Sequence, residues 1–235
     1  MPITPDSTIY WKHGFVHLNA TILYTWILMT LLTVVSWLVT RHLDSSDLHR
    51  SRWQNVLEGI VVTIRGQIRE ICPEAADTYL PFIGTIFLLI AVSSLLELVP
   101  GWHAPTASLS TTAALAICVA VAVHVFGILR QGVAEYLRHY VRPTFLMLPF
   151  HLLSETSRTL ALALRLFGNI MSESLLVGVL LAIAPLFFPL VMQAFGLLTG
   201  LIQAYIFAVL SMVYIAAAVQ SQSEQKSEQK GRAHE

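Results

Sequence analysis

Long apolar segments, each with few or no charged residues, dominate the pattern of the chain. A helix that crosses the hydrocarbon core of a bilayer needs about 20 mostly apolar residues. Five segments meet that requirement, at residues 18–39, 79–98, 109–129, 159–184 and 190–219. Prolines separate the second segment from the third, and the short Pro185–Pro189 break between the last two predicts a tight hairpin. The pattern therefore predicts an all-α integral membrane protein with about five membrane-crossing helices.

The segment between the first two spans has a different pattern. Apolar side chains recur there at helical spacing and form one stripe, at Val56, Ile60, Ile64 and Ile68. The charged side chains lie mostly off that stripe, at Glu58, Arg65, Arg69 and Glu70. Residues 53–71 are therefore predicted to form an amphipathic helix on the membrane surface or against partner helices. An ordinary linker helix is the alternative interpretation.

Lysine and arginine residues are distributed unevenly among the connections. They cluster after the first, third and fifth spans, whereas residues 99–108 and 184–189 contain none. Because connections rich in Lys and Arg stay in the cytoplasm, the N-terminus is expected outside and the C-terminus inside. The expected organisation is one membrane domain, residues 18–219, between an outer segment, residues 1–17, and a cytoplasmic tail, residues 220–235, that is expected to be disordered.

The composition agrees with a membrane protein and excludes several other classes. Only 12% of the 235 residues are charged, against about 25% in soluble domains. The net charge is zero, which gives no basic surface for nucleic acid. The two cysteines, Cys72 and Cys118, have no metal-like spacing, and no nucleotide-binding or nucleophile motif occurs. We therefore expect no cofactor, no metal and no catalytic activity of the chain by itself.

Two charged residues lie inside the fourth span, where each costs several kcal/mol, roughly 2.5–3.5 for arginine on insertion scales. They are Arg165 and, eight residues later, Glu173. A separation of about 12 Å along a helix prevents them from neutralising each other directly. Asn169 and Ser172 share the helical face of Arg165, between small residues that would let another helix approach. A functional role is favoured over a structural ion pair.

Other polar residues near the spans are weaker candidates. Gln203 shares a face of the last span with Gly196 and Gly200, and it is either a packing amide or a hydrogen-bond partner of Arg165. Glu97, with Ser94 one turn before it, lies near the outer surface and is either functional or an interfacial charge. His124 is isolated in an apolar span and is expected to be satisfied locally.

Four segments together resemble subunit a of F-type ATP synthases. The first, LLSETSRTLALALRLFGN at residues 152–169, is similar to the signature of that family, and three more follow the family's order: PFIGTIFLLIAVSSLLELVPG at 81–101, PTASLSTTAALA at 105–116 and IQAYIFAVLSMVYI at 202–215. The resemblance covers about residues 55–218. It implies a long tilted hairpin of the last two helices around a ring of c subunits, with the second helix on the membrane surface.

The resemblance also implies roles for individual residues. Arg165 matches the stator arginine that faces the ring carboxylates, Gln203 the polar residue beside it, and Asn169 the lining of an outer half-channel. Many members carry an acid nine residues after the arginine, where this chain has Ser174, and its own acid is Glu173. The implied partners are the c-ring, the peripheral-stalk subunit b and the bilayer.

The expected function is translocation of protons, or alternatively of sodium ions, by a bacterial inner-membrane stator subunit with two half-channels. The residues expected on the outer path are Glu173, Asn169, Ser172, Gln203, Glu97 and Ser94. Glu155 is expected on the cytoplasmic path, and the Arg165 side chain is expected to point out toward the ring, close to Gln203. A self-contained transporter would predict internal repeats, and none is found in the sequence. A purely structural membrane subunit would leave Arg165 unexplained.

Overall fold

The structure is a computed structural model, and it describes residues 9–13, 16–41, 52–72, 76–99, 102, 104–133, 148–183 and 188–232. A short antiparallel hairpin comes first, formed by β1 (Ile9–His13) and β2 (Val16–Asn19). Most of it lies in the expected outer segment, residues 1–17, and its last two residues lie in the predicted first span. The elements that follow are α1 (Ala20–Thr40), α2 (Arg52–Ile71), α3 (Ala76–Leu96), the 3₁₀ turn η2 (Pro105–Ala107), α4 (Leu109–Gln131), α6 (Leu148–Ile183) and α7 (Phe188–Arg232).

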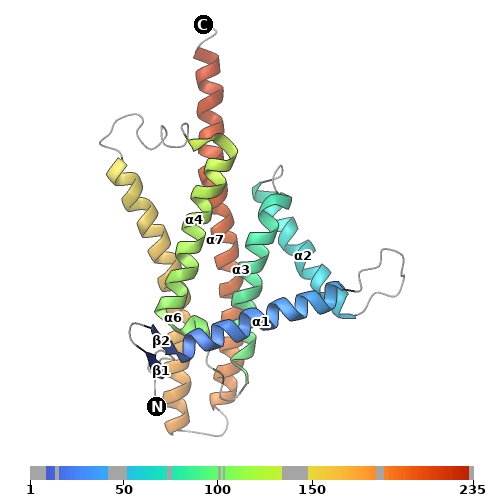
Figure 1. The fold of residues 1–235 in the computed structure, drawn as a ribbon, viewed down its shortest axis with the longest axis vertical. Coiled ribbons are helices and arrows are strands. Elements are labelled where there is room, and N and C mark those ends of the chain that lie inside the picture. Colours follow the sequence, from blue (N-terminus) through green and yellow to red (C-terminus); the bar gives the residue numbers. More distant parts are fainter. Residues whose placement is uncertain are drawn as a thin grey trace.

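Five helices of the described residues are long and apolar enough to cross a membrane: α1, α3, α4, α6 and α7. Each contains most of one apolar segment of the sequence, so the predicted fold class is confirmed. In Figure 1, α3, α4, α6 and α7 run roughly along the long axis of the molecule, whereas α1 crosses them at a steep angle. Helix α1 therefore cannot be parallel to the membrane normal in an orientation where the other four helices are.

The last two helices form a long hairpin. Helix α6 has 36 residues, hence a length of about 54 Å, which exceeds the roughly 30 Å of a hydrocarbon core. An upright α6 would leave apolar turns outside the bilayer, so its length favours a tilted orientation. It packs against α7 along the hairpin, as Figure 1 shows. The turn at residues 184–187 lies outside the described residues.

Both helices of the hairpin are longer than predicted. Helix α6 begins at Leu148 instead of near residue 159, because the charges of Glu155 and Arg158 limit a span but do not interrupt a helix. Helix α7 continues to Arg232, so residues 220–232 are helical in this structure, where disorder was expected. Their Gln, Glu and Lys residues are good helix formers, and no glycine or proline precedes Gly231. Residues 233–235 lie outside the described part.

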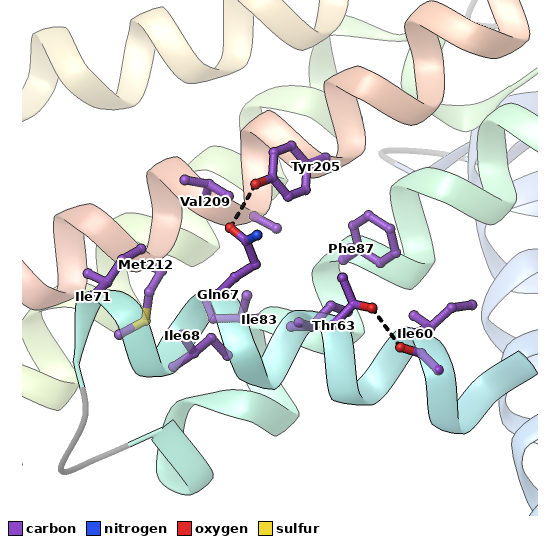
Figure 2. Close-up of a pocket in the computed structure, with 13 residues that line it drawn as sticks. Ile60, Thr63, Gln67, Ile68, Ile71, Ile83, Phe87, Tyr205, Val209 and Met212 are labelled. Carbon is purple, nitrogen blue, oxygen red and sulfur yellow. Dashed lines mark hydrogen bonds between the residues drawn. The ribbon is translucent and has the colours of Figure 1, made fainter. Parts of the chain in front are cut away.

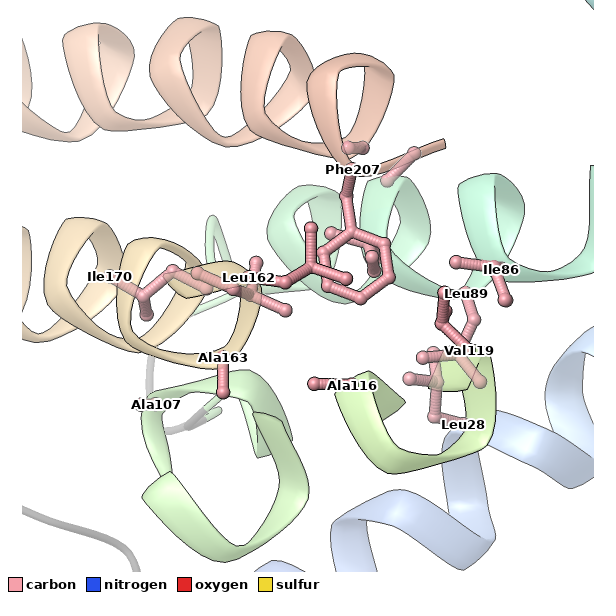
Figure 3. Packing of buried hydrophobic residues seen from close by; sticks show 14 residues of the cluster. Leu28, Ile86, Leu89, Ala107, Ala116, Val119, Leu162, Ala163, Ile170 and Phe207 are labelled. Atoms are coloured by element: carbon pink, nitrogen blue, oxygen red, sulfur yellow. The ribbon is translucent and has the colours of Figure 1, made fainter. Parts of the chain in front are cut away.

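The core surrounds α7, which packs against α3, α6 and α4. Figure 3 shows Phe207 of α7 pointing into a cluster with Leu162 and Ala163 of α6, Val119 of α4 and Leu89 of α3. Phe207 is fully buried in this cluster. A second cluster contains Ile68 of α2, together with residues of α3 and of the later part of α7.

The predicted amphipathic helix is confirmed as α2, and its apolar stripe faces α3 and α7. Figure 2 shows that Gln67 of α2 meets Tyr205 of α7, whose hydroxyl donates a hydrogen bond of 2.7 Å to the Gln67 Oε1 atom. A cavity of about 310 Å³ between α2, α3 and α7 has an almost entirely aliphatic and aromatic lining. The charged side chains of Glu58, Arg69 and Glu70 are exposed.

Candidate functional site

The face of α6 that carries Arg165 lies on the outside of the helix bundle. Arg165 and Ser172 are exposed, and Asn169 at the edge of this face is half-buried. The opposite face supplies buried core residues, among them Leu162, Leu166 and Ile170. Within the described residues, Arg165 forms no ion pair with either Glu97 or Glu173. The guanidinium is therefore accessible to a partner outside this chain, in agreement with the expected direction of the side chain.

Two carboxylates meet where α3, α6 and α7 come together. Glu97 lies in the turn just after α3, and the charge of Glu173 on α6 is close enough to act on it. The Ser174 hydroxyl lies 3.5 Å from the Glu97 Oε1 atom, at the long limit of a hydrogen bond, and 3.0 Å from the Ile170 carbonyl oxygen. We call Ser94, Glu97, Glu173 and Ser174 the acidic cluster.

The environment of Glu97 favours its protonated form. Burial raises the pKa of the Glu97 carboxyl to about 7, and the neighbouring Glu173 carboxyl adds to the rise, while the hydrogen bond from Ser174 opposes it. A carboxyl group with a pKa of about 7 exchanges its proton readily at neutral pH. The acidic cluster is therefore a candidate proton-binding site.

Two glycines of α7 allow this helix to approach the acidic cluster. A Cβ atom at Gly196 would overlap the carboxyl group of Glu173. One turn later, a Cβ atom at Gly200 would come within 2.7 Å of the Oγ atom of Ser94, which is buried and donates to the Ile90 carbonyl. Small residues on a helix face allow another helix to approach closely, and here the neighbouring helices belong to the same chain. The face packs against α3 and α6 of the same chain.

Gln203 lies on the same inward side of α7. Only 6% of its surface is exposed, and its Nε2 atom has no hydrogen-bond partner among the described residues. A buried donor without a partner costs about 1–3 kcal/mol, so this amide retains the capacity to bind a polar group. Among the described residues, no hydrogen bond joins Gln203 to Arg165, and their closeness stays a prediction.

Glu155 lies on α6 on the other side of Arg165 from the acidic cluster. Along the helix, Glu155 precedes Arg165 by about 15 Å and Glu173 follows it by about 12 Å. The Glu155 Oε1 atom is 3.1 Å from the Nε2 atom of His124 on α4. The Nδ1 atom of His124 lies 2.7 Å from the Ala120 carbonyl oxygen, so the local contact expected for this histidine is present.

Sequence reasoning missed the partner that His124 has in Glu155. The two residues lie on different helices, separated in the chain by residues 134–147, which are outside the described part. Each residue was singled out separately in the sequence. No pattern within either helix indicates that their side chains meet.

These features define a multi-pass helical membrane protein whose ionisable side chains lie before, at and after the middle of one long span. The family model described as the ATP synthase A chain matches residues 22–216. The chain belongs to this family.

Three relatives with similar names illustrate the extent of the similarity. The chain is 57% identical to ATP synthase subunit a 2 of Acaryochloris marina over 220 residues, which are 94% of each chain. It is 57% identical to subunit a 1 of Crocosphaera subtropica over 222 residues, 94% of this chain and 96% of the relative. Identity to subunit a of Albidiferax ferrireducens is 57% over 218 residues, 93% of this chain and 94% of the relative.

Membership in this family assigns the general role of the chain. It is an ion-translocating, non-catalytic stator subunit in the membrane sector of the ATP synthase, and it works in a complex with other subunits of that enzyme. Its five apolar helices make it a multi-pass membrane protein.

Proposed function

We propose that this chain translocates protons between two half-channels and that Arg165 separates them at the surface of a ring of c subunits. The observation that carries the proposal is the position of Arg165. Its side chain is exposed on the outer face of α6, with the acidic cluster on one side along the helix and Glu155 on the other. A fixed positive charge between two acidic regions has the arrangement that a separator requires.

The chemistry of arginine supports this role. A guanidinium stays charged at any physiological pH, so it attracts an ionised ring carboxylate and repels a cation that would leak directly from one half-channel to the other. A charge exposed to lipid is costly unless it finds an acceptor. The neighbouring Ala161 and Gly168 on the same face are small enough for a ring helix to bring its carboxylate close.

The outer half-channel in this proposal leads through the acidic cluster. Glu97 and Glu173 exchange the proton, Ser94 and Ser174 orient it, and Asn169, Ser172 and Gln203 line the way toward the ring. The cytoplasmic half-channel leads past Glu155. The proton is the ion proposed because the cluster consists of carboxyl and hydroxyl groups, and burial favours the protonated form of Glu97. Transport that requires added sodium would favour the alternative.

The proposed setting is the inner membrane of a bacterium, with the N-terminus outside and the peripheral-stalk subunit b beside the chain. The distribution of lysine and arginine supports this orientation, because 12 of the 14 such residues follow the first, third or fifth apolar segment of the sequence. It would place the acidic cluster near the outer surface and Glu155 near the cytoplasm.

Substitution of Arg165 tests the proposal directly. Arg165→Ala should abolish ATP-driven proton pumping into membrane vesicles while the complex still assembles and hydrolyses ATP, because only the separating charge is lost. Arg158→Ala is the matched control, since Arg158 lies on the same side of α6 with its guanidinium 5.6 Å from the Tyr214 ring centre. Pumping by Arg165→Ala at the rate of the unaltered complex would refute the proposal.

A further inference from the structure

His124 and Glu155 form a contact between α4 and α6 that the family role does not explain. The side chain of Glu155 is 22% exposed and that of His124 is 39% exposed, so both are sheltered but accessible. Glu155 also borders a hollow of about 320 Å³ between the two helices, whose walls include Thr156, Thr159 and several alanines. A water molecule needs roughly 10–15 Å³ of such space and two or more polar partners, so the hollow has room for water beside the Glu155 carboxylate and the two threonine hydroxyls.

The hydrogen bonds determine how many protons this pair holds. A carbonyl oxygen only accepts, so the Nδ1 atom of His124 must carry a proton and donate it to Ala120. The contact of 3.1 Å between the Nε2 atom and the Glu155 Oε1 atom then requires one more proton. That proton lies on Nε2, giving imidazolium and carboxylate, or on Oε1, giving imidazole and carboxylic acid. Without it, two lone pairs would face each other.

The intact contact therefore contains one proton that can lie on either of the two atoms. In the described part, up to residue 219 of α7, the packed helices carry further titratable or charged side chains, namely His151, Arg158, Arg165 and Glu173 on α6, Cys118 and Arg130 on α4, and Tyr205 and Tyr214 on α7. Arg158 lies over the Tyr214 ring, and His151 and Arg130 are exposed.

We propose that His124 and Glu155 together form a proton-binding station of the cytoplasmic half-channel. This inference rests on the proposed function, to which it adds His124. During ATP-driven pumping, a hydronium ion of the cytoplasmic water gives a proton to the Nε2 lone pair of neutral His124 and becomes water, and the new N–H bond is stabilised by the Glu155 carboxylate. The N–H bond then breaks, and the proton passes through water to an ionised ring carboxylate. Synthesis reverses these transfers, and no redox partner is needed.

The test is the pH profile of pumping by the whole ATP synthase in liposomes. His124→Gln keeps a side chain that can still donate to Glu155, but it removes the exchangeable proton. Pumping should match the unaltered complex near pH 6, where protons are abundant, and fall about tenfold near pH 8.5, where the station must collect scarce protons. Glu155→Gln should shift the profile in the same direction.

Two further variants distinguish a station from a structural ion pair. The double variant with His124→Gln and Glu155→Gln should be no slower than the slower single variant, because both changes remove the same proton. His151→Gln, one turn before Glu155 and exposed, should keep the original profile. The proposed role of the pair would be refuted by an unshifted pH profile of pumping in both single variants, or by losses of pumping rate that add up in the double variant.

Pumping by Arg165→Ala distinguishes a failure of this inference from a failure of the proposed function on which it rests. If Arg165→Ala does not pump and His124→Gln has an unshifted pH profile of pumping, only the proposed role of His124 and Glu155 is refuted. If Arg165→Ala pumps normally, the proposed separator fails whatever the result for His124.

Discussion

At the scale of single residues, Ser174 and Glu173 are neighbours in sequence but face different helices. Ser174 stands at the position where the family resemblance implies an acid, and its hydroxyl turns toward Glu97 at the end of α3. Glu173 is rotated by about 100° from it and turns toward α7. There Gly196 leaves room for the carboxyl group. The two acids of the cluster thus come from α3 and α6, and a glycine of α7 makes the arrangement possible.

Substitution of Gly196 tests this arrangement. Gly196→Ala places a methyl group where the Glu173 carboxyl lies, so the carboxyl must move. The carboxyl group ends a flexible side chain and can turn aside at little cost in stability, but it then leaves its place beside Glu97, so we expect proton pumping to slow several-fold in a complex that still assembles. The measurement is the initial rate of ATP-driven pumping in vesicles.

A glycine of the same hairpin in open surroundings is the control. A Cβ atom at Gly178 of α6 meets nothing within 4 Å. Gly178→Ala should therefore leave pumping unchanged and stabilise the helix slightly, by up to about 1 kcal/mol. Equal rates for the Gly196 and Gly178 variants would show that transport does not depend on the position of Glu173.

At the scale of elements, α2 combines two kinds of surface. Its charged side chains are exposed, whereas Ile68 is 2% exposed within the second core cluster beside Met212 of α7. The contact from Tyr205 to Gln67 adds a polar link between the same two helices. Helix α2 is therefore held to the bundle mainly by one apolar stripe, with α3 and α7 as its neighbours.

The energy of this contact can be measured with two substitutions in α2. Ile68→Ala removes buried methyl groups and should destabilise the purified chain in detergent by about 2–5 kcal/mol. Val62→Ala is the control, because Val62 is 61% exposed and should cost little. Thermal unfolding followed by circular dichroism gives both values. A similar loss for the two variants would mean that α2 is not held by its inward stripe.

At the scale of the whole molecule, one helix connects the two proposed half-channels. Helix α6 carries Glu155, Arg165 and Glu173 in order along its length, and its buried side packs against α4 and α7. The partners differ at the two ends: His124 of α4 faces Glu155, whereas Glu97 and Gly196 of α7 lie beside Glu173. The hairpin therefore keeps the two acidic regions at a defined distance on either side of the arginine.

The orientation of the molecule in the membrane gives a prediction at this scale. With the N-terminus outside, Lys12→Cys should react with a membrane-impermeant maleimide added to intact cells stripped of their outer membrane. Lys230→Cys should react only in inside-out vesicles. A variant with both native cysteines, Cys72 and Cys118, replaced by serine provides the background. Reaction of the two positions from the same side would contradict the five crossings.

The sequence by itself determined the number of spans, the amphipathic helix and the outward direction of Arg165. Each of these depends on features within one segment: the length of an apolar run, or the angular positions of residues around one helix. The signature around Arg165 and three further segments also indicated the family. Helix ends were less predictable, because the charges of Glu155 and Arg158 that limit a span do not stop a helix.

Only the tertiary structure decided which helix faces meet. A helical wheel places Gly196, Gly200 and Gln203 together, but it does not give the rotation of α7 relative to its neighbours. The structure turns that face inward onto Glu173 and Ser94. The same rotation of helices brings His124 to Glu155 from distant parts of the chain. Contacts between helices depend on the packing of all their side chains at once, and no local pattern of the sequence contains that information.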